Sequence, residues 1–119
     1  MPSLVAKVAA VVPRESGERV LCAAYVSGSR SSVGSAVIAV SDRHLYVAPR
    51  AAFLSRGAWR ARSLGDVRIE SSRGLLGLGS ARRFEIFEDD SSALVFELET
   101  SKEAKEFRNA FGPRLVGRR

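Results

Sequence analysis

Apolar and polar residues alternate along most of this chain in short runs, which polar or glycine-containing segments separate. A period of two places successive side chains on opposite faces of a strand, so such a run predicts a strand with one buried and one exposed face. The pattern predicts seven strands, at residues 19–26, 33–40, 45–48, 59–64, 67–71, 82–88 and 93–99. Short, evenly spaced strands favour a β-sandwich or a β-barrel.

The stretch Ala36–Arg50 is expected to form the central hairpin of this sheet. Two apolar, β-branched runs flank the polar segment Ser-Asp-Arg-His, which is the pattern of two strands joined by a short turn. Leu45 and Val47 should point to one face of the sheet and Tyr46 to the other. We expect Asp42 to have a structural role, in which its carboxylate accepts hydrogen bonds from amides of the turn.

A short helix is predicted before the first strand, within residues 1–13. Ser3 can cap its N-terminus, the leucine and valines that follow recur at the spacing of one helical face, and Pro13 ends it. We expect this helix to dock on or beside the sheet through its valines. Self-association and attachment to a membrane surface are the alternatives, but the polar face carries too few charges for the membrane role.

A second helix is predicted after the last strand. Thr100 and Glu103 match the capping box T-x-x-E, and Gly112 followed by a proline ends the helix. One face of this helix carries the apolar residues Ala104, Phe107 and Phe111. Residues 113–119 are rich in arginine and are expected to form a frayed basic tail.

Charge is the unusual feature of the composition. The 119 residues suffice for one domain, and the hydrophobic fraction of 45% is ordinary, but the net charge is +6. Residues 1–83 hold 13 basic and 5 acidic residues, whereas residues 84–119 hold 6 basic and 8 acidic residues. This division favours contact with a phospholipid surface, a nucleic acid or an acidic protein face, or head-to-tail pairing of copies. The alternative is that the arginines only keep the protein soluble.

Seven short strands followed by one amphipathic helix is also the order of the pleckstrin-homology-like (PH-like) architecture. The sequence resembles bacterial PH-like and GRAM-like domains in three places. Gly17 and Glu18 open a "G-E-x-hydrophobic" segment. Val40–Tyr46 is close to the family's "T-D-x-R-L" hairpin, with serine for threonine and histidine for the usual arginine. The third place runs from Leu64 through the Gly-Leu-Leu-Gly segment to Ile86, and the resemblance spans most of residues 17–111.

The resemblance implies a mainly β fold with α: a seven-stranded bent antiparallel sheet, or partly open barrel, capped by the C-terminal helix. The PH-like domain would cover residues 17–112, with the N-terminal helix as an addition and residues 113–119 as a tail. In PH domains, phosphoinositide-type ligands meet basic residues around the first hairpin loop. Here that loop, Ser27–Ser32, holds Arg30 alone, so the usual basic cluster is missing.

Two sets of residues are candidate contacts. A loose patch for anionic lipid would contain the arginines Arg30, Arg50, Arg56 and Arg73. Contacts with a partner would come from the apolar loop residues Phe53, Leu54, Leu75, Leu76 and Leu78. For the three leucines at 75–78 we favour capping of the open barrel end, or packing against another copy, over insertion into a lipid interface.

The sequence offers little for catalysis. One cysteine, Cys22, and one histidine, His44, cannot build a zinc site. Ser41, Asp42 and His44 are the residue types of a hydrolase triad, but they are neighbours in a tight turn. The glycine-rich run Gly74–Gly79 lacks the lysine of a P-loop. We therefore expect no catalytic residues, no metal and no cofactor.

The sequence thus predicts a non-catalytic interaction module. Homo-oligomeric assembly or contact with a protein partner ranks first, and weak peripheral binding to anionic membrane lipids ranks second. Nonspecific nucleic-acid binding ranks third, because no array of stacking aromatics accompanies the arginines. Lys7 interrupts the N-terminal apolar run, so we do not expect a signal peptide there. The single cysteine, Cys22, fits a reducing compartment. We expect a cytoplasmic protein, at most peripheral at a membrane.

Overall fold

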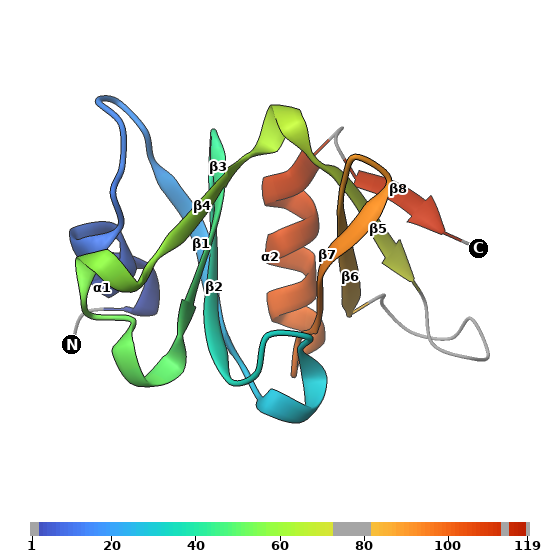
Figure 1. Ribbon diagram of the computed structural model, residues 1–119, viewed down its shortest axis with the longest axis horizontal. Coiled ribbons are helices and arrows are strands. Elements are labelled where there is room, and N and C mark those ends of the chain that lie inside the picture. The colour runs from blue at the N-terminus through green and yellow to red at the C-terminus, as the bar shows by residue number, and fades with distance from the viewer. Residues whose placement is uncertain (1–2, 73–81, 113–114, 119) are drawn as a thin grey trace.

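Two four-stranded sheets and two helices make up the fold in the computed structural model, which describes residues 3–72, 82–112 and 115–118 (Figure 1). The first sheet, sheet A, has the order β1-β2-β3-β4 and consists of β1 (Val20–Val26), β2 (Ala36–Ser41), β3 (His44–Pro49) and β4 (Arg60–Ser63). The second, sheet B, has the order β7-β6-β5-β8 and consists of β5 (Arg68–Ser72), β6 (Arg83–Glu88), β7 (Ser91–Glu97) and β8 (Leu115–Arg118). The helices are α1 (Leu4–Val11) and α2 (Ser101–Phe111).

The seven expected strands and both helices are present, which confirms the β-rich fold, but the strands divide into two sheets and do not form the single bent sheet that was one form of the expectation. The division falls between β4 and β5, where a short 3-10 turn at Leu64–Asp66 redirects the chain and no strand pairing continues across it. On the other side, among the described residues, Ser31 forms a single bridge with Phe96 of β7. Among the described residues, the two sheets are therefore joined by this turn and this single bridge, and they do not close into a barrel.

The expected C-terminal tail contains a strand. Residues 115–118 form β8, which pairs in parallel with β5, so that Leu115 lies opposite Ile69. Leu115 also packs against the main core. An edge strand left open exposes a row of unpaired amides and carbonyls, and β8 covers that edge of β5.

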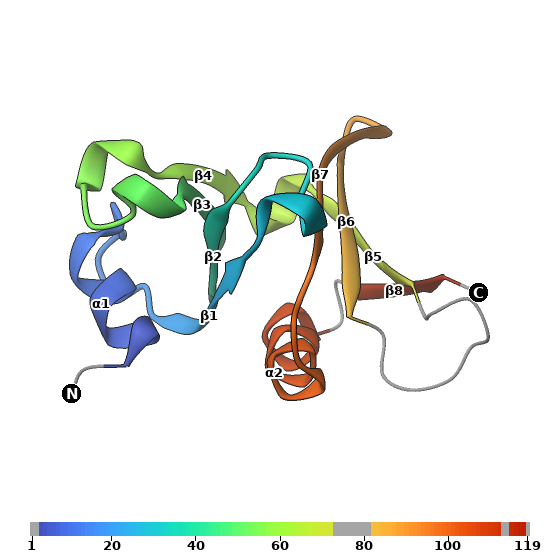
Figure 2. The same ribbon diagram turned by 90° about the horizontal axis from the view of Figure 1, so that it is seen from below.

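The main core lies between the two sheets and α2, as Figure 2 shows. Thr100 caps α2, because its Oγ1 accepts a hydrogen bond from the N–H of Glu103 at 3.1 Å. Four aromatic rings from sheet B and α2 fill the centre, with ring centroids 5.5 to 6.3 Å apart: Phe84, Phe96, Phe107 and Phe111. The capping box and the apolar stripe predicted for this helix both have the expected roles.

A second apolar cluster covers the outer face of sheet A. Helix α1, capped by the Ser3 side chain, packs there against β1, and the cluster also contains residues of β2, β3 and the segment before β4. Its buried members are Val8, Val12, Val20, Val37, Ala39, Tyr46, Ala48 and Trp59. All six residues of β2 are buried: Val37 and Ala39 lie in the outer cluster, Ala36, Ile38 and Val40 lie in the main core, and Ser41 is a buried polar residue.

Candidate functional site

The strands of sheet A are antiparallel, so the segments that connect them lie in two groups, one at each end of the strands. Residues 27–35 and 49–59 meet at one edge, which we call the loop end, at the bottom of sheet A in Figure 1. Residues 13–19 and the β2–β3 turn at 41–44 meet at the other, which we call the turn end. Each end has a distinct chemistry.

Three exposed arginines stand at the loop end. The Arg50 guanidinium lies over the ring of Tyr25, 4.6 Å from its centroid, and the Arg50 backbone N–H donates to the carbonyl of Ser35 at 3.0 Å. Arg56 begins the second 3-10 turn of the 49–59 loop, and Arg60 begins β4. Across the part of the chain that the structure describes, no carboxylate forms an ion pair with any of the three. Their charge is available to a partner.

Apolar side chains are exposed beside these arginines. Leu54 is 60% exposed and Val33, in the neighbouring loop, is 50% exposed. Phe53 is half-buried: its ring packs edge-on against Tyr25 at 5.8 Å, and its carbonyl accepts a hydrogen bond from Nε1 of Trp59 at 2.7 Å. The loop is thus fixed to the outer cluster by Phe53, while Leu54 faces solvent.

The structure brings some of the expected contact residues together and separates others. The 49–59 loop carries the predicted Arg50, Phe53, Leu54 and Arg56. Arg30 is engaged elsewhere, since its Nη1 lies 3.1 Å from a carboxylate oxygen of Glu97 on β7. The candidates Arg73, Leu75, Leu76 and Leu78 lie outside the described residues. The sequence analysis did not include Arg60 among the candidate contact residues. Its position at the start of an expected strand, next to this loop, could have indicated it.

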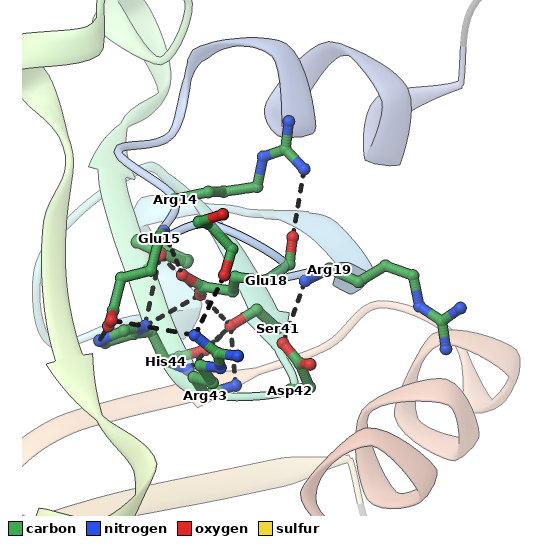
Figure 3. A network of polar contacts seen from close by, with 10 residues as sticks. Arg14, Glu15, Glu18, Arg19, Ser41, Asp42, Arg43 and His44 are labelled. Atoms are coloured by element: carbon green, nitrogen blue, oxygen red, sulfur yellow. Dashed lines mark hydrogen bonds and ion pairs between the residues drawn. The ribbon is translucent and has the colours of Figure 1, made fainter.

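The turn end is organised by a buried carboxylate. Glu18 is 3% exposed and accepts a hydrogen bond from the hydroxyl of Ser41 (Figure 3). It accepts another from the hydroxyl of Tyr46 at 2.7 Å. His44 Nδ1 lies 2.9 Å from the same carboxylate, and the backbone N–H of Glu15 donates to its other oxygen at 2.9 Å. One side chain from the loop before β1 is thus bound to both strands of the central hairpin.

These contacts determine the ionisation of the cluster. Burial alone raises the pKa of Glu18, but hydrogen bonds from Ser41, Tyr46, the Glu15 amide and His44 outweigh it and hold the pKa at about 2. Burial and the neighbouring Glu18 carboxylate raise the pKa of Tyr46, so its hydroxyl stays a donor. A carboxylate with so low a pKa is a poor proton acceptor at neutral pH, which argues against acid–base catalysis here.

The β2–β3 turn is held by Ser41 more than by Asp42. The Ser41 Oγ accepts the backbone N–H groups of Arg43 at 3.0 Å and His44 at 2.8 Å. Asp42 instead accepts the backbone N–H of Arg19 at 3.0 Å, and its own N–H donates to the Arg19 carbonyl at 3.1 Å. Asp42 therefore fixes the turn to the start of β1.

Glu15, Glu18 and His44 also form a group with possible metal-ligand atoms within 4.8 Å of one another. The sequence analysis did not find this group, because it considered only cysteine and histidine as metal ligands. Both ring nitrogens of His44 already have partners, however, because Nε2 lies 3.3 Å from the Glu15 carboxylate and Nδ1 lies 2.9 Å from the Glu18 carboxylate. A cation would have to displace the groups that donate hydrogen bonds to Glu18. The geometry therefore fits a structural role, in which Glu18 holds the loop before β1 to the hairpin, better than a metal centre.

No protein-family model matches the chain, and no curated protein matches it. Neither of the described helices is both long enough and apolar enough to cross a membrane.

Proposed function

We propose that this protein is a non-catalytic, PH-like interaction module that contacts its partner through the loop end of sheet A. The order of seven strands before a capping helix supports the PH-like assignment, as does the packing of two sheets around that helix. The observation that carries the functional proposal is the exposed Leu54 beside arginines without carboxylate partners in the described structure. A contiguous exposed apolar patch that polar residues surround marks an interaction site, and Val33 is exposed at the same end as Leu54.

A second copy of the chain is the first candidate partner. The basic loop end lies at the bottom of Figure 1, and the β6–β7 turn lies at the top, with the exposed Asp89 and with Asp90, which is exposed but already paired with Arg68 at 3.0 Å. These two regions of opposite charge permit a head-to-tail contact, in which Leu54 is covered and Arg50 and Arg56 meet carboxylates.

An anionic membrane is the second candidate, favoured because Val33 and Leu54 both project from the same edge of sheet A. Completing the burial of two half-exposed aliphatic side chains contributes roughly 2 kcal/mol, from about 2 kcal/mol for each full burial. Three arginines near an anionic surface contribute about 1 kcal/mol each. A total of about 5 kcal/mol corresponds to a Kd of a few hundred micromolar, so one copy would bind weakly.

Light scattering after size exclusion, over a range of concentrations, tests the first form. We expect a rise in mass that Leu54→Ser and Arg56→Glu abolish. Lys102→Glu is the matched control, because Lys102 is exposed on α2, away from this surface.

Sedimentation with vesicles of phosphatidylcholine and phosphatidylserine tests the second form with the same variants. Pelleting that requires phosphatidylserine and falls with added salt would support membrane docking. A wild-type protein that stays monomeric and also remains unbound to these vesicles at low salt would overturn the proposal in both forms.

A further inference from the structure

Strand β4 ends sheet A on one side, and among the described residues no other strand pairs with its outer side. Strand β1, at the other side of the sheet, packs against both helices. Strand β4 instead is exposed at three of its four residues and is drawn in front of the rest of sheet A in Figure 1. The outer side of such a strand presents amides and carbonyls with which another strand can pair.

The pairing of β4 with β3 determines which backbone groups face outward. The Leu64 N–H donates to the Arg43 carbonyl at 2.9 Å, and successive residues of an antiparallel strand alternate in facing their neighbour. The even-numbered residues of β4 therefore face β3, and Ala61 and Ser63 face away. The Ser63 carbonyl begins the 3-10 turn that follows. The N–H and carbonyl of Ala61 and the N–H of Ser63 are left without a backbone partner in the described structure.

Two arginines lie on one face of β4. Arg60 is opposite Val47, and Arg62 is opposite Leu45. Both residues of β3 belong to the main core, so the two arginines lie on the same, core-side face of sheet A. Arg62 contacts Glu88 through Nε at 2.6 Å and keeps further N–H donors, because a guanidinium has five. No described carboxylate forms an ion pair with Arg60.

We infer that β4 binds an extended protein segment with acidic residues at alternate positions. In antiparallel pairing, the residue opposite Ala61 would exchange two main-chain hydrogen bonds with it. The residues on either side of that one would lie opposite Arg60 and Arg62, and opposite charges at directly opposed positions stabilise a pair of strands. The site extends the loop-end surface along β4 and rests on the proposed function for Arg60 alone.

Other strands fit this side of β4 less well. Antiparallel pairing of two copies of β4, centred on Ala61, would set Arg60 of each copy directly opposite Arg62 of the other. Like charges at opposed positions destabilise the pair of strands. A wholly apolar segment would cover the guanidinium groups without offering them a partner, which is costly. A segment with a carboxylate on each side of its central residue avoids both costs.

A titration with the acetylated and amidated peptide Thr-Glu-Val-Glu-Thr, followed by amide chemical shifts, tests the inference. The largest shifts are expected at Ala61 and Ser63, together with slower amide exchange at both. The same peptide with an N-methylated valine cannot donate to the Ala61 carbonyl and should bind roughly fivefold more weakly. Arg60→Glu should weaken binding by roughly the same factor. The matched control is Arg83→Glu, which changes an exposed arginine on sheet B and should leave binding unchanged.

The inference is wrong if the peptide does not bind, if the N-methylated peptide binds as tightly, or if Arg83→Glu weakens binding as much as Arg60→Glu. Leu54→Ser, which should abolish self-association, should leave peptide binding unchanged, so the two proposals can fail separately. A protein that stays monomeric and unbound to vesicles but binds this peptide would retain the β4 site and lose the loop-end contact.

Discussion

Replacing Glu18 with glutamine should destabilise the protein and change how its stability depends on pH. Glu18→Gln keeps the shape of the side chain but removes the charge that Ser41, Tyr46 and His44 contact. The glutamine can still accept hydrogen bonds through its amide oxygen. The effect expected is therefore the loss of the charge-assisted part of the network.

The size of the effect comes from the pKa of Glu18. Folding lowers the pKa from 4.5 to about 2. At about 1.4 kcal/mol per pKa unit, the ionised carboxylate stabilises the folded state by about 3 kcal/mol at neutral pH. Small domains are stable by roughly 5–15 kcal/mol, so this loss is large enough to measure directly.

The sign of the pH dependence follows from the direction of the pKa shift. Because the folded-state pKa is the lower one, the stabilisation is complete above pH 4.5 and is lost as the pH falls toward 2. The wild-type protein should exceed Glu18→Gln in stability near neutral pH. The difference in the free energy of unfolding between the two proteins should disappear as the pH falls from 4.5 toward 2.

Urea unfolding followed by the fluorescence of Trp59, the single tryptophan, measures this gap as a function of pH. Glu99→Gln is the control, since Glu99 is exposed and its carboxylate forms no hydrogen bond or ion pair with a described residue; only its backbone carbonyl accepts a bond, from Arg82. The control should change the free energy of unfolding by less than roughly 0.5 kcal/mol. A gap for Glu18→Gln that stays constant with pH, or that only equals the control, would refute the reasoning.

Three further predictions concern the two cores. Phe107→Ala removes a ring from the centre of the main core and should cost about 3–5 kcal/mol, measured as a lower urea midpoint at unchanged m. Trp59→Phe removes the 2.7 Å hydrogen bond to the Phe53 carbonyl and should cost about 1 kcal/mol. It should also speed amide exchange in the 49–59 loop; unchanged exchange there would contradict the proposed anchoring. Burial raises the pKa of the Cys22 thiol to about 12, so a disulfide reagent at neutral pH should label it rapidly only after unfolding, and fast labelling of the folded protein would contradict its burial.

The strands and helices were predictable because each depends on local sequence. A period of two or a capping box is complete within a few residues, and all nine predicted elements are present. The pairing of strands is not local. The separation of β4 from β5 depends on the turn at Leu64–Asp66, and β8 depends on contacts with β5, so neither could be inferred from alternation. The burial of β2 on both faces had a signal, its unbroken apolar run, which is typical of a strand covered on each side.

The candidate functional residues divide in the same way. Arg50, Phe53, Leu54 and Arg56 are close in sequence, and the structure places them in one loop. The role of Glu18 could not be predicted, because its three side-chain donors are 23 to 28 residues away. An acidic residue in a polar loop is ordinarily exposed. The one hint was the buried tyrosine of the central hairpin, whose hydroxyl needed a partner.

The two apolar clusters span different lengths of chain, and this has a consequence for folding during synthesis. The outer cluster is complete within residues 4–59, whereas the main core needs α2 and Leu115. A ribosome produces the N-terminal half first, so α1 can cover its face of sheet A while α2 is still missing. The opposite face of β2 and β3 then stays open to water, with Ile38 and Leu45 exposed. We expect a chain interrupted before Ser101 to aggregate through this uncovered face, whereas a chain that includes α2 and Leu115 covers it.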